Sequence, residues 1–219
     1  MKLFDLDGTL LDSNLLWREI DIAFLRRRGI PWTEEYNQGV IHAIFPTAAR
    51  FTRDYCHLSE TPEEIMAEWL DMAREGYERT LGVKPGALEY LARCSGAGER
   101  LALFTSAEPE LCQAALAGRG FDRYLSQVVY ARELNMEKRS PAAFREAARI
   151  LGAAPEEITF FDDSPVSCRG ARAAGFTVVG VYDGCFAAQE GEMRSLCHGY
   201  IRSFQELLAP EGGIIPALR

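Results

Sequence analysis

The chain has 219 residues, of which 47% are hydrophobic and 26% are charged, and its formal net charge is −8. This length and composition are typical of one globular domain with an insert, and they provide enough apolar residues for a substantial core. The acidic balance argues against a nucleic-acid partner, whose phosphates would be repelled in the absence of a basic patch.

No apolar run in the sequence approaches the ~18 residues of a membrane span, so we expect no membrane partner. The chain is predicted to begin on a structural strand, which leaves no room for a targeting segment. The six cysteines show neither a Cys-x-x-Cys pair nor a paired spacing with histidine, so zinc is not expected. We therefore predict a cytoplasmic protein with reduced, mostly buried thiols.

The first predicted element is a short apolar strand, Leu3-Phe4, that leads directly into Asp5. Asp7 follows two residues later, so strand alternation places both carboxylates on one face, where they repel each other. A hard, oxygen-binding cation such as Mg²⁺ between them would relieve this repulsion. Gly8 allows a sharp turn and a close approach of backbone N–H groups to an anion. The stretch therefore indicates a nucleophile, an acid/base group and a metal site on one loop.

Residues 14–81 show helical patterns and no strand pattern. In the first helix, the run Arg26–Arg28 is more typical of a helix C-terminus than of a substrate clamp. The region 32–55 is helical but broken, with a new turn at Pro46, and Thr61-Pro62 begins a further helix. The pattern predicts an all-helical unit inserted after the first strand.

Strand and helix patterns alternate from residue 83 onward. The predicted strands cover 100–106, 127–130, 158–161 and 176–182, and the predicted helices cover 86–93, 109–116, 141–151, a segment that ends at Gly175, and a C-terminal segment at 204–208. This alternation predicts an α/β fold with a doubly wound, mainly parallel sheet, formed by residues 1–13 and 82–219. In such sheets, ligands bind at the carboxyl ends of the strands.

Polar residues stand at those carboxyl ends. Thr105 and Ser106 end one strand, where hydroxyl groups and free backbone N–H groups before a helix can bind phosphate oxygens. Asp162 and Asp163 end another strand, and two adjacent acids again require a cation. Lys138 lies in a loop before a proline-led helix, where its ammonium group can offset charge if carboxylates and a phosphoryl group crowd together.

Four stretches of the sequence together resemble the motifs of the haloacid dehalogenase superfamily of phosphohydrolases. These are Asp5-Leu-Asp7-Gly-Thr9, the apolar strand that ends in Thr105, Lys138 before Pro141, and Asp162-Asp163. They occur in the order found in the family and span residues 1 to about 182. The resemblance implies a Rossmann-like core and identifies the helical unit at 14–81 as the cap domain that closes over the active site.

The resemblance also implies a role for each motif residue. Asp5 would attack phosphorus and form an aspartyl-phosphate, while Asp7 would protonate the leaving oxygen and then activate water. Thr105, Ser106 and Lys138 would hold the phosphoryl oxygens. The implied Mg²⁺ ligands are Asp5, Asp7 and either or both of Asp163 and Asp162.

The sequence departs from the family pattern at two places that bear on the site. Arg139 stands where relatives usually carry proline, so Arg139 instead of Lys138 could supply the cation. Ser167 and Cys168 stand where relatives often have a further acid or amide, which leaves the division of metal ligands between Asp162 and Asp163 open.

An acid at position 7 favours hydrolysis of a phosphate ester, because family members that cleave a halide or a phosphonate lack this acid. The predicted function is therefore a Mg²⁺-dependent phosphatase that acts on a small phosphorylated metabolite. A phosphomutase and a non-catalytic binding protein with the same fold are the alternatives. Candidates for substrate contact in the cap are its polar and aromatic residues, including Trp17, Arg18, His42, Arg50 and His57. The sequence indicates neither an oligomeric state nor a role for the tail at 209–219.

Overall fold

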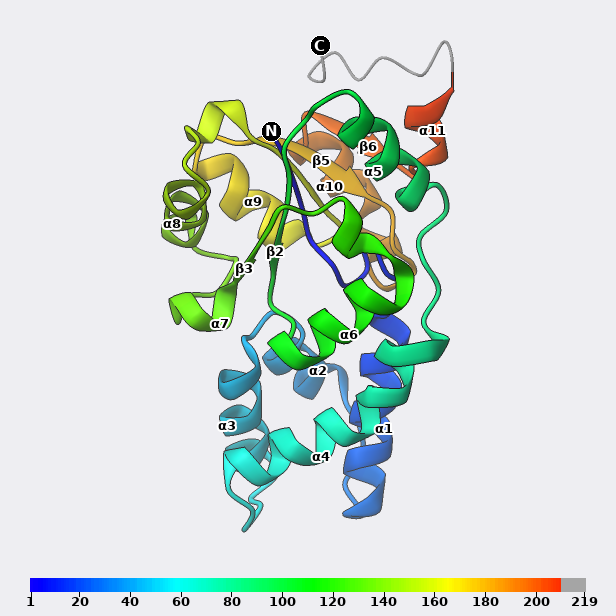
Figure 1. Cartoon of the computed structure of the whole chain (residues 1–219). Helices are drawn as coiled ribbons and strands as arrows, with labels where there is room; N and C mark the ends of the chain where they lie inside the picture. Colours follow the sequence, from blue (N-terminus) through cyan, green and yellow to red (C-terminus); the bar gives the residue numbers. More distant parts are fainter. Residues whose placement is uncertain (210–219) are drawn as a thin grey trace.

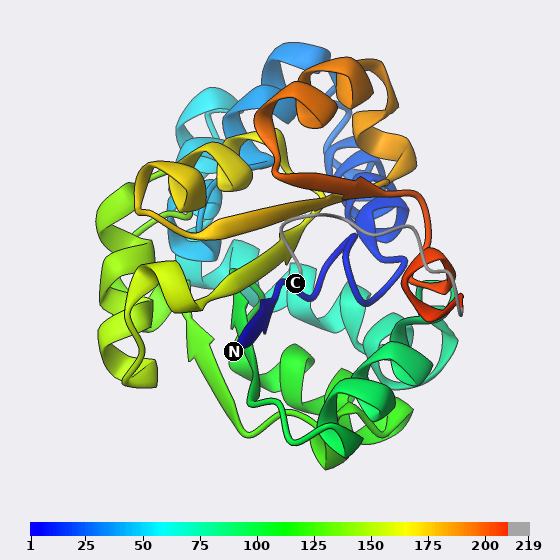
Figure 2. The same cartoon turned by 90° about the horizontal axis from the view of Figure 1, so that it is seen from above.

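The computed structural model describes residues 1–209, and its six strands form one parallel sheet (Figures 1 and 2). The strands are β1 (Lys2–Phe4), β2 (Leu101–Thr105), β3 (Gln127–Tyr130), β4 (Thr159–Asp162), β5 (Thr177–Val181) and β6 (Gly199–Ile201). Their order is β3-β2-β1-β4-β5-β6, and every neighbouring pair is parallel. This confirms the predicted doubly wound sheet, and it places β1, which leads into Asp5, between β2 and β4.

The segment between β1 and β2 begins with a group of helices that lies beyond the carboxyl ends of the strands and forms the cap (Figure 1). Its members are α1 (Asn14–Arg27), α2 (Glu34–Val40), α3 (Phe45–Tyr55), α4 (Pro62–Glu75) and the π-helix η1 (Gly76–Thr80). Pro46 lies in the first turn of α3, as predicted for the break at this position. A capping box between Thr61 and Glu64 begins α4. Arg28, at the end of the arginine run, pairs with Glu68 of α4 at 2.6 Å. The run therefore joins two cap helices and is not a substrate clamp.

The remaining helices surround the sheet. They are α5 (Ala87–Gly96), α6 (Pro109–Arg119), α7 (Ala131–Leu134), α8 (Pro141–Leu151), α9 (Pro165–Ala173), α10 (Glu190–Leu196) and α11 (Gln205–Leu208), with short 3-10 helices η2 (Phe121–Arg123), η3 (Pro155–Glu157) and η4 (Gly184–Gln189). The region 184–201, which contains η4, α10 and β6, was not predicted from the sequence. The tail at 210–219 lies outside the described residues, as does the end of the predicted core segment.

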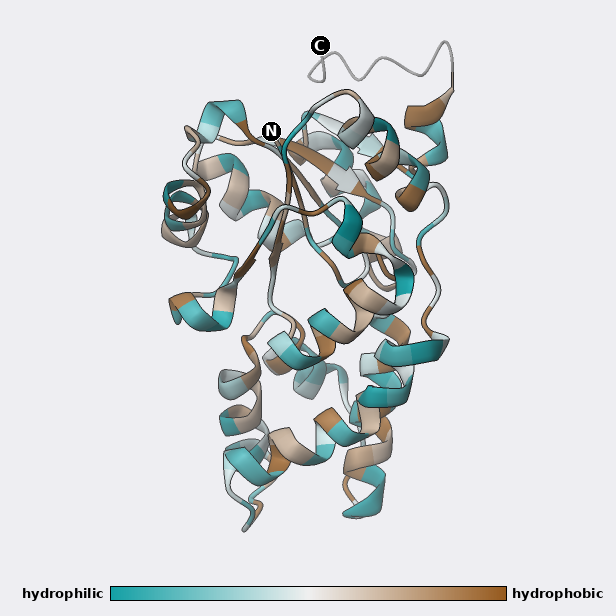
Figure 3. Ribbon diagram, viewed as in Figure 1, coloured by the Kyte–Doolittle hydropathy of each residue, from teal (hydrophilic) through white to brown (hydrophobic). Residues whose placement is uncertain are grey.

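Alternation along the strands divides the core into two layers. Leu3 and Phe160 face α8, α9 and α10, whereas Phe4 and Phe161 face α5 and α11. The rings of Phe4 and Phe161 stack with their centroids 4.8 Å apart. Figure 3 shows the strands as largely hydrophobic, as expected for a parallel sheet covered on both faces. The sheet is therefore a rigid support for the side chains at its carboxyl edge.

The cap joins the core through two chain segments that lie side by side. The N–H of Asp12 donates to the carbonyl of Gly82 at 2.9 Å, and the N–H of Lys84 donates to the carbonyl of Leu10 at 2.9 Å. The ammonium group of Lys84 also pairs with Asp183 at 2.6 Å, which fixes the returning segment to the end of β5. The division of the chain at 13/14 and 81/82 stays a prediction, although it falls at these two segments.

Two further properties bear on the sequence-based expectations. All six cysteines carry free thiols, and four of them are buried. Among residues 1–209, no helix is both long enough and apolar enough to cross a membrane.

Candidate active site

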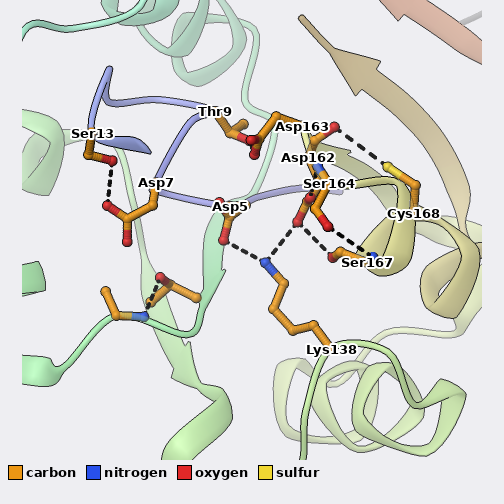
Figure 4. A network of polar contacts seen from close by, with 12 residues as sticks. Asp5, Asp7, Thr9, Ser13, Lys138, Asp162, Asp163, Ser164, Ser167 and Cys168 are labelled. Atoms are coloured by element: carbon orange, nitrogen blue, oxygen red, sulfur yellow. Dashed lines mark hydrogen bonds and ion pairs between the residues drawn. The ribbon is translucent and has the colours of Figure 1, made fainter. Parts of the chain in front are cut away.

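A pocket with an empty volume of about 590 Å³ opens between the carboxyl edge of the sheet and the cap. Acids from two loops line it: Asp5 and Asp7 follow β1, and Asp162 and Asp163 lie at the end of β4. The other lining residues are Asn14, Ile41, His42, Ala43, Ser106, Lys138, Arg139, Ser164, Val166, Ser167 and Phe186. The structure thus brings both predicted acid pairs into one cleft. Figure 4 shows the ammonium group of Lys138 between Asp5 and Asp162, one acid from each pair.

Lys138 connects the two acid pairs. Its Nζ atom lies 2.5 Å from Oδ1 of Asp5 and 2.7 Å from Oδ2 of Asp162, and its side chain is 9% exposed (Figure 4). Arg139 also lines the pocket, but its side chain is 55% exposed and pairs with Glu137. Of the two cations considered from the sequence, the structure places Lys138 between the carboxylates.

The two adjacent acids after β4 have different partners. Asp162 accepts hydrogen bonds from the N–H of Ser164 and the hydroxyl of Ser167, each at 2.7 Å, in addition to its contact with Lys138. Asp163 accepts from the hydroxyl of Thr9 at 3.0 Å and from the side-chain amide of Asn14 at 2.8 Å. Asp162 is therefore held by a cation and two neutral donors, whereas the partners of Asp163 are neutral.

Gly8 is required by the close packing of the first loop. Its φ is +75°, and an added Cβ would collide with the side chains of Asn14 and Asp163. Any other residue would therefore be strained in its backbone and would displace an acid from the pocket.

Asp7 accepts hydrogen bonds from two hydroxyl groups. Ser13 donates to Oδ1 of Asp7 at 2.6 Å, and the hydroxyl of Tyr77 in η1 donates to the same oxygen. Ser13 occupies the N-cap position of α1, but its side chain makes no capping hydrogen bond. The hydroxyl of Ser13 is instead used to hold Asp7.

The two hydroxyl residues after β2 lie differently. Ser106 lines the pocket. Thr105 is fully buried, and its hydroxyl oxygen accepts a hydrogen bond from the N–H of Ala107 at 3.0 Å. This bond shapes the turn before α6, and Thr105, unlike Ser106, is not among the residues that line the pocket.

The cap residues predicted to contact substrate lie in different places. His42 lines the pocket and stacks on Phe186, with ring centroids 5.9 Å apart. Trp17 lies behind Asp7 and donates to Tyr77. The other three candidates, Arg18, Arg50 and His57, do not line the pocket. Arg18 instead lies over the ring of Trp32.

Sequence reasoning missed Asn14, Tyr77 and Phe186. Asn14 and Tyr77 lie in the predicted helical unit, where a helical pattern alone assigns them no polar role, and Phe186 lies in the unpredicted region after β5. The one available signal for Asn14 was its position five residues after Thr9. A helix that starts there can place its first side chain beside the loop that carries Asp5 and Asp7.

Burial dominates the electrostatics of the site. It raises the pKa of Asp5 to about 8, although the ammonium group of Lys138 acts in the opposite direction. Burial also raises the pKa of Asp163 well above its ordinary value, with a further contribution from Asp162, and it raises the pKa of Asp7. Burial alone would lower the pKa of Lys138, but Asp162 and Asp5 more than offset this, so its pKa is raised.

The pocket is therefore lined by four carboxyl groups, two of which, Asp5 and Asp162, share one buried ammonium group. Such a site is short of positive charge and offers oxygen donors, and both properties suit a hard divalent cation. Among residues 1–209, no three side chains of Asp, Glu, His or Cys converge as a complete metal site. An ion here would therefore need backbone, water or phosphate oxygens as well, and Mg²⁺ commonly uses such a mixed set.

The fold and the pocket define an α/β protein with a helical cap over an acid-rich cleft. A family model described as haloacid dehalogenase-like hydrolase matches residues 3–175. The chain belongs to this family, and the resemblance seen in the sequence is confirmed.

Several curated relatives are named as phosphatases. The chain is 26% identical to validoxylamine A 7'-phosphate phosphatase of Streptomyces hygroscopicus subsp. limoneus, with 83% of this chain and 84% of the relative covered. It is 28% identical to hexitol phosphatase A of Escherichia coli, with 82% and 81% covered. The crystal structure of a CbbY mutant from Rhodobacter sphaeroides in complex with xylulose 1,5-bisphosphate has a TM-score of 0.81 and 22% identity, with 96% and 97% covered. At this identity, the structural similarity concerns the fold.

Proposed function

We propose that the protein is a Mg²⁺-dependent phosphatase that hydrolyses a small phosphorylated metabolite through an aspartyl-phosphate on Asp5. The observation that carries this proposal is the contact of Lys138 with both Asp5 and Asp162 in a pocket that Asp7 and Asp163 also line. This arrangement supplies a carboxylate nucleophile, a second carboxyl group for proton transfer and a fixed positive charge. The pocket is also lined by both polar and apolar side chains, as small-molecule sites commonly are.

In the first step, the Asp5 carboxylate attacks phosphorus in line with the leaving oxygen and forms an acyl phosphate. Lys138, fixed between Asp5 and Asp162, stabilises the negative charge that spreads over the phosphoryl oxygens. Ser106 and the N–H groups of the loops at the pocket edge would bind those oxygens, with Thr105 as a further donor.

Asp7 is positioned for proton transfer. It lines the same pocket as Asp5 and lies two residues further along the loop. Because burial raises its pKa, Asp7 retains a proton more readily than an exposed aspartate and can give it to the leaving alkoxide. The resulting carboxylate then accepts a proton from the water that cleaves the acyl phosphate, which restores both aspartates.

The residues that would hold Mg²⁺ are Asp5 and Asp163, with the loop at Asp7 as a third contributor. Asp162 suits this task less well, because Lys138, Ser164 and Ser167 already engage its oxygens. When bound, the ion supplies positive charge that offsets the repulsion between the Asp5 carboxylate and the phosphate.

The names of the relatives support the substrate class. By their names, the two curated relatives described above act on validoxylamine A 7'-phosphate and on hexitol phosphates, and the CbbY structure holds xylulose 1,5-bisphosphate. A small polyhydroxylated phosphate ester is consistent with a pocket that contains both polar residues and the aromatic pair His42 and Phe186.

The experiment is release of phosphate from p-nitrophenyl phosphate with Mg²⁺, followed by a panel of sugar and polyol phosphates. Asp5→Asn is expected to lower kcat by at least ~10³-fold, because an amide is a poor nucleophile. The exposed Asp122 gives a matched control, and Asp122→Asn should retain wild-type activity.

Equal activity of Asp5→Asn and wild type would remove Asp5 as the nucleophile. An isomerised sugar phosphate without free phosphate, in the presence of a bisphosphate activator, would instead identify a mutase. Binding of the panel compounds without turnover would identify a non-catalytic binding protein.

A further inference from the structure

A chain of hydrogen bonds connects the cap to Asp7. The indole Nε1–H of Trp17 in α1 donates to the hydroxyl oxygen of Tyr77 at 2.7 Å, and the hydroxyl of Tyr77 donates to Oδ1 of Asp7. Ser13 donates to the same oxygen at 2.6 Å (Figure 4). Tyr77 is fully buried, whereas Asp7 is half-buried and lines the pocket, so the chain of bonds leads from the cap interior to the cleft.

The direction of each bond is fixed by chemistry. An indole N–H can only donate, so the oxygen of Tyr77 accepts from Trp17 and its single proton is directed to Asp7. Because two donors occupy Oδ1 of Asp7, that oxygen cannot itself donate without losing one of them. Among residues 1–209, no hydrogen bond reaches Oδ2. Oδ2 is therefore the oxygen that can carry a transferable proton.

The position of Tyr77 depends on a rare local geometry. Tyr77 lies in the π-helix η1, where the wider turn shifts side chains relative to a continued α-helix and leaves carbonyl groups without regular partners. Arg119 of α6 donates to the carbonyls of Gly76 at 3.1 Å and Leu81 at 3.0 Å, and also to the carbonyl of Tyr77. A core helix thus holds the segment that presents the Tyr77 hydroxyl.

This arrangement consists of a π-turn, an arginine with three carbonyl partners, and the indole of Trp17 as donor to a buried tyrosine. A tyrosine needed only for apolar packing would require none of these polar contacts, since a phenylalanine would fill nearly the same volume. The contacts converge on one oxygen of one carboxyl group, the group to which the proposed mechanism assigns proton transfer.

We propose that Tyr77, oriented by Trp17, is a positioning residue that holds Asp7 with Oδ1 occupied and Oδ2 free to protonate the leaving oxygen. This inference rests on the proposed phosphatase function. It predicts that loss of the Tyr77 hydroxyl lowers kcat/KM more for substrates whose leaving group is more basic. A p-nitrophenolate departs without a proton, whereas phenolate and alkoxides need one.

The experiment compares kcat/KM for p-nitrophenyl phosphate and phenyl phosphate in wild type and Tyr77→Phe. Phenyl phosphate turnover is expected to fall about tenfold or more, and p-nitrophenyl phosphate turnover less than threefold, because only the former relies on the acid. Trp17→Phe should show the same split with a smaller loss, since Tyr77 would keep its bond to Asp7 but not its fixed direction. Trp17→Phe also tests the inference if Tyr77→Phe fails to fold.

Tyr36→Phe is the matched control. Tyr36 is also a fully buried tyrosine of the cap, and its hydroxyl lies 3.0 Å from the hydroxyl of Thr52 in the cap interior. Its loss should change both turnover rates equally or not at all. Melting temperatures of the variants give their stability independently of activity.

Equal losses for the two esters in Tyr77→Phe, or no loss for either, would overturn the positioning role and leave the phosphatase assignment intact. Absence of Asp5-dependent phosphate release from the wild-type protein would overturn the assignment itself, and the positioning role with it.

Discussion

Carboxyl groups with raised pKa values occur in both the cap and the core, and their surroundings differ. In the cap, Asp21 of α1 accepts one hydrogen bond, from the hydroxyl of Tyr36 at 3.4 Å, and burial raises its pKa to about 7. At the edge of the sheet, Asp5 shares the ammonium group of Lys138 with Asp162, yet its pKa is raised to about 8.

The difference shows two solutions to the same desolvation problem. A single carboxyl group inside the cap can stay neutral at the cost of a raised pKa. Four carboxyl groups in one pocket also repel each other, so one ammonium group does not supply enough positive charge. The cap acid therefore affects the free energy of unfolding, whereas the core acids form a site that attracts cations.

Metal removal should have the largest effect, and it should act on the acids of the core and not on Asp21 of the cap. Dialysis against EDTA is expected to lower phosphatase activity by at least ~10³-fold. The charge of the metal ion offsets the repulsion between the carboxylate nucleophile and the phosphate, which lowers the activation free energy by several kcal/mol. Added Mg²⁺ should restore activity and raise the melting temperature, measured by circular dichroism. Full activity after exhaustive chelation would show that Lys138 alone balances the acids.

Lys138→Met should have the next largest effect. It leaves Asp5 and Asp162 buried without their shared cation, so the free energy of unfolding without metal should fall by ~3–5 kcal/mol. Urea titration measures this loss, and p-nitrophenyl phosphate turnover should fall by at least ~10²-fold. A variant as stable and active as wild type would mean that the two carboxyl groups do not depend on the ammonium group.

Asp21→Asn should stabilise the protein at alkaline pH. The folded-state pKa of Asp21 is above its unfolded value, so the wild type loses stability as pH rises from about 4 to about 7. The amide needs no proton to stay neutral, so the variant should exceed wild type by ~1–3 kcal/mol at pH 8, where desolvation of the carboxylate is at its full cost.

Urea titrations of wild type and Asp21→Asn at pH 5 and pH 8 test this sign. The difference between the two proteins isolates Asp21, because the active-site acids contribute equally to both. A variant less stable than wild type at pH 8 would indicate that the Asp21 carboxylate is ionised and stabilised in the folded cap.

Arg139→Ala should have the smallest effect. Arg139 is largely exposed and pairs with Glu137 of the same loop, so the free energy of unfolding should change by less than ~0.5 kcal/mol. Activity should stay within about twofold of wild type if Lys138 is the cation that acts on phosphate. A loss comparable to that of Lys138→Met would transfer this role to Arg139.

Much of the fold could be predicted because its signals are local. Apolar runs that end in Asp5, Thr105 and Asp162 predicted three strands and the edge at which their polar residues meet. The strand β6 has three residues, Gly199–Ile201, which is too short for alternation to be recognised. It pairs with β5 because the preceding helix brings it there, a tertiary effect without a local signal.

The polar contacts inside the site were less accessible to sequence reasoning. Tyr77 fits the helical spacing of the apolar residues in α4, so its periodicity predicted a core residue. The hydroxyl contact with Asp7 spans 70 positions and depends on a π-turn that no periodicity indicates. Likewise, Lys138 and Arg139 are adjacent in sequence, and their burial distinguishes them only in three dimensions.

The central place of β1 in the sheet has a consequence for biosynthesis. Leu3 pairs with Ala102 on one side and with Phe160 on the other, so β1 is translated before both of its partners and has neither of them for about a hundred residues. At the usual pace of a ribosome, this interval lasts on the order of ten seconds. The emerging β1 segment must therefore stay unaggregated until these distant segments emerge, and pairing over such sequence separations should make refolding slow.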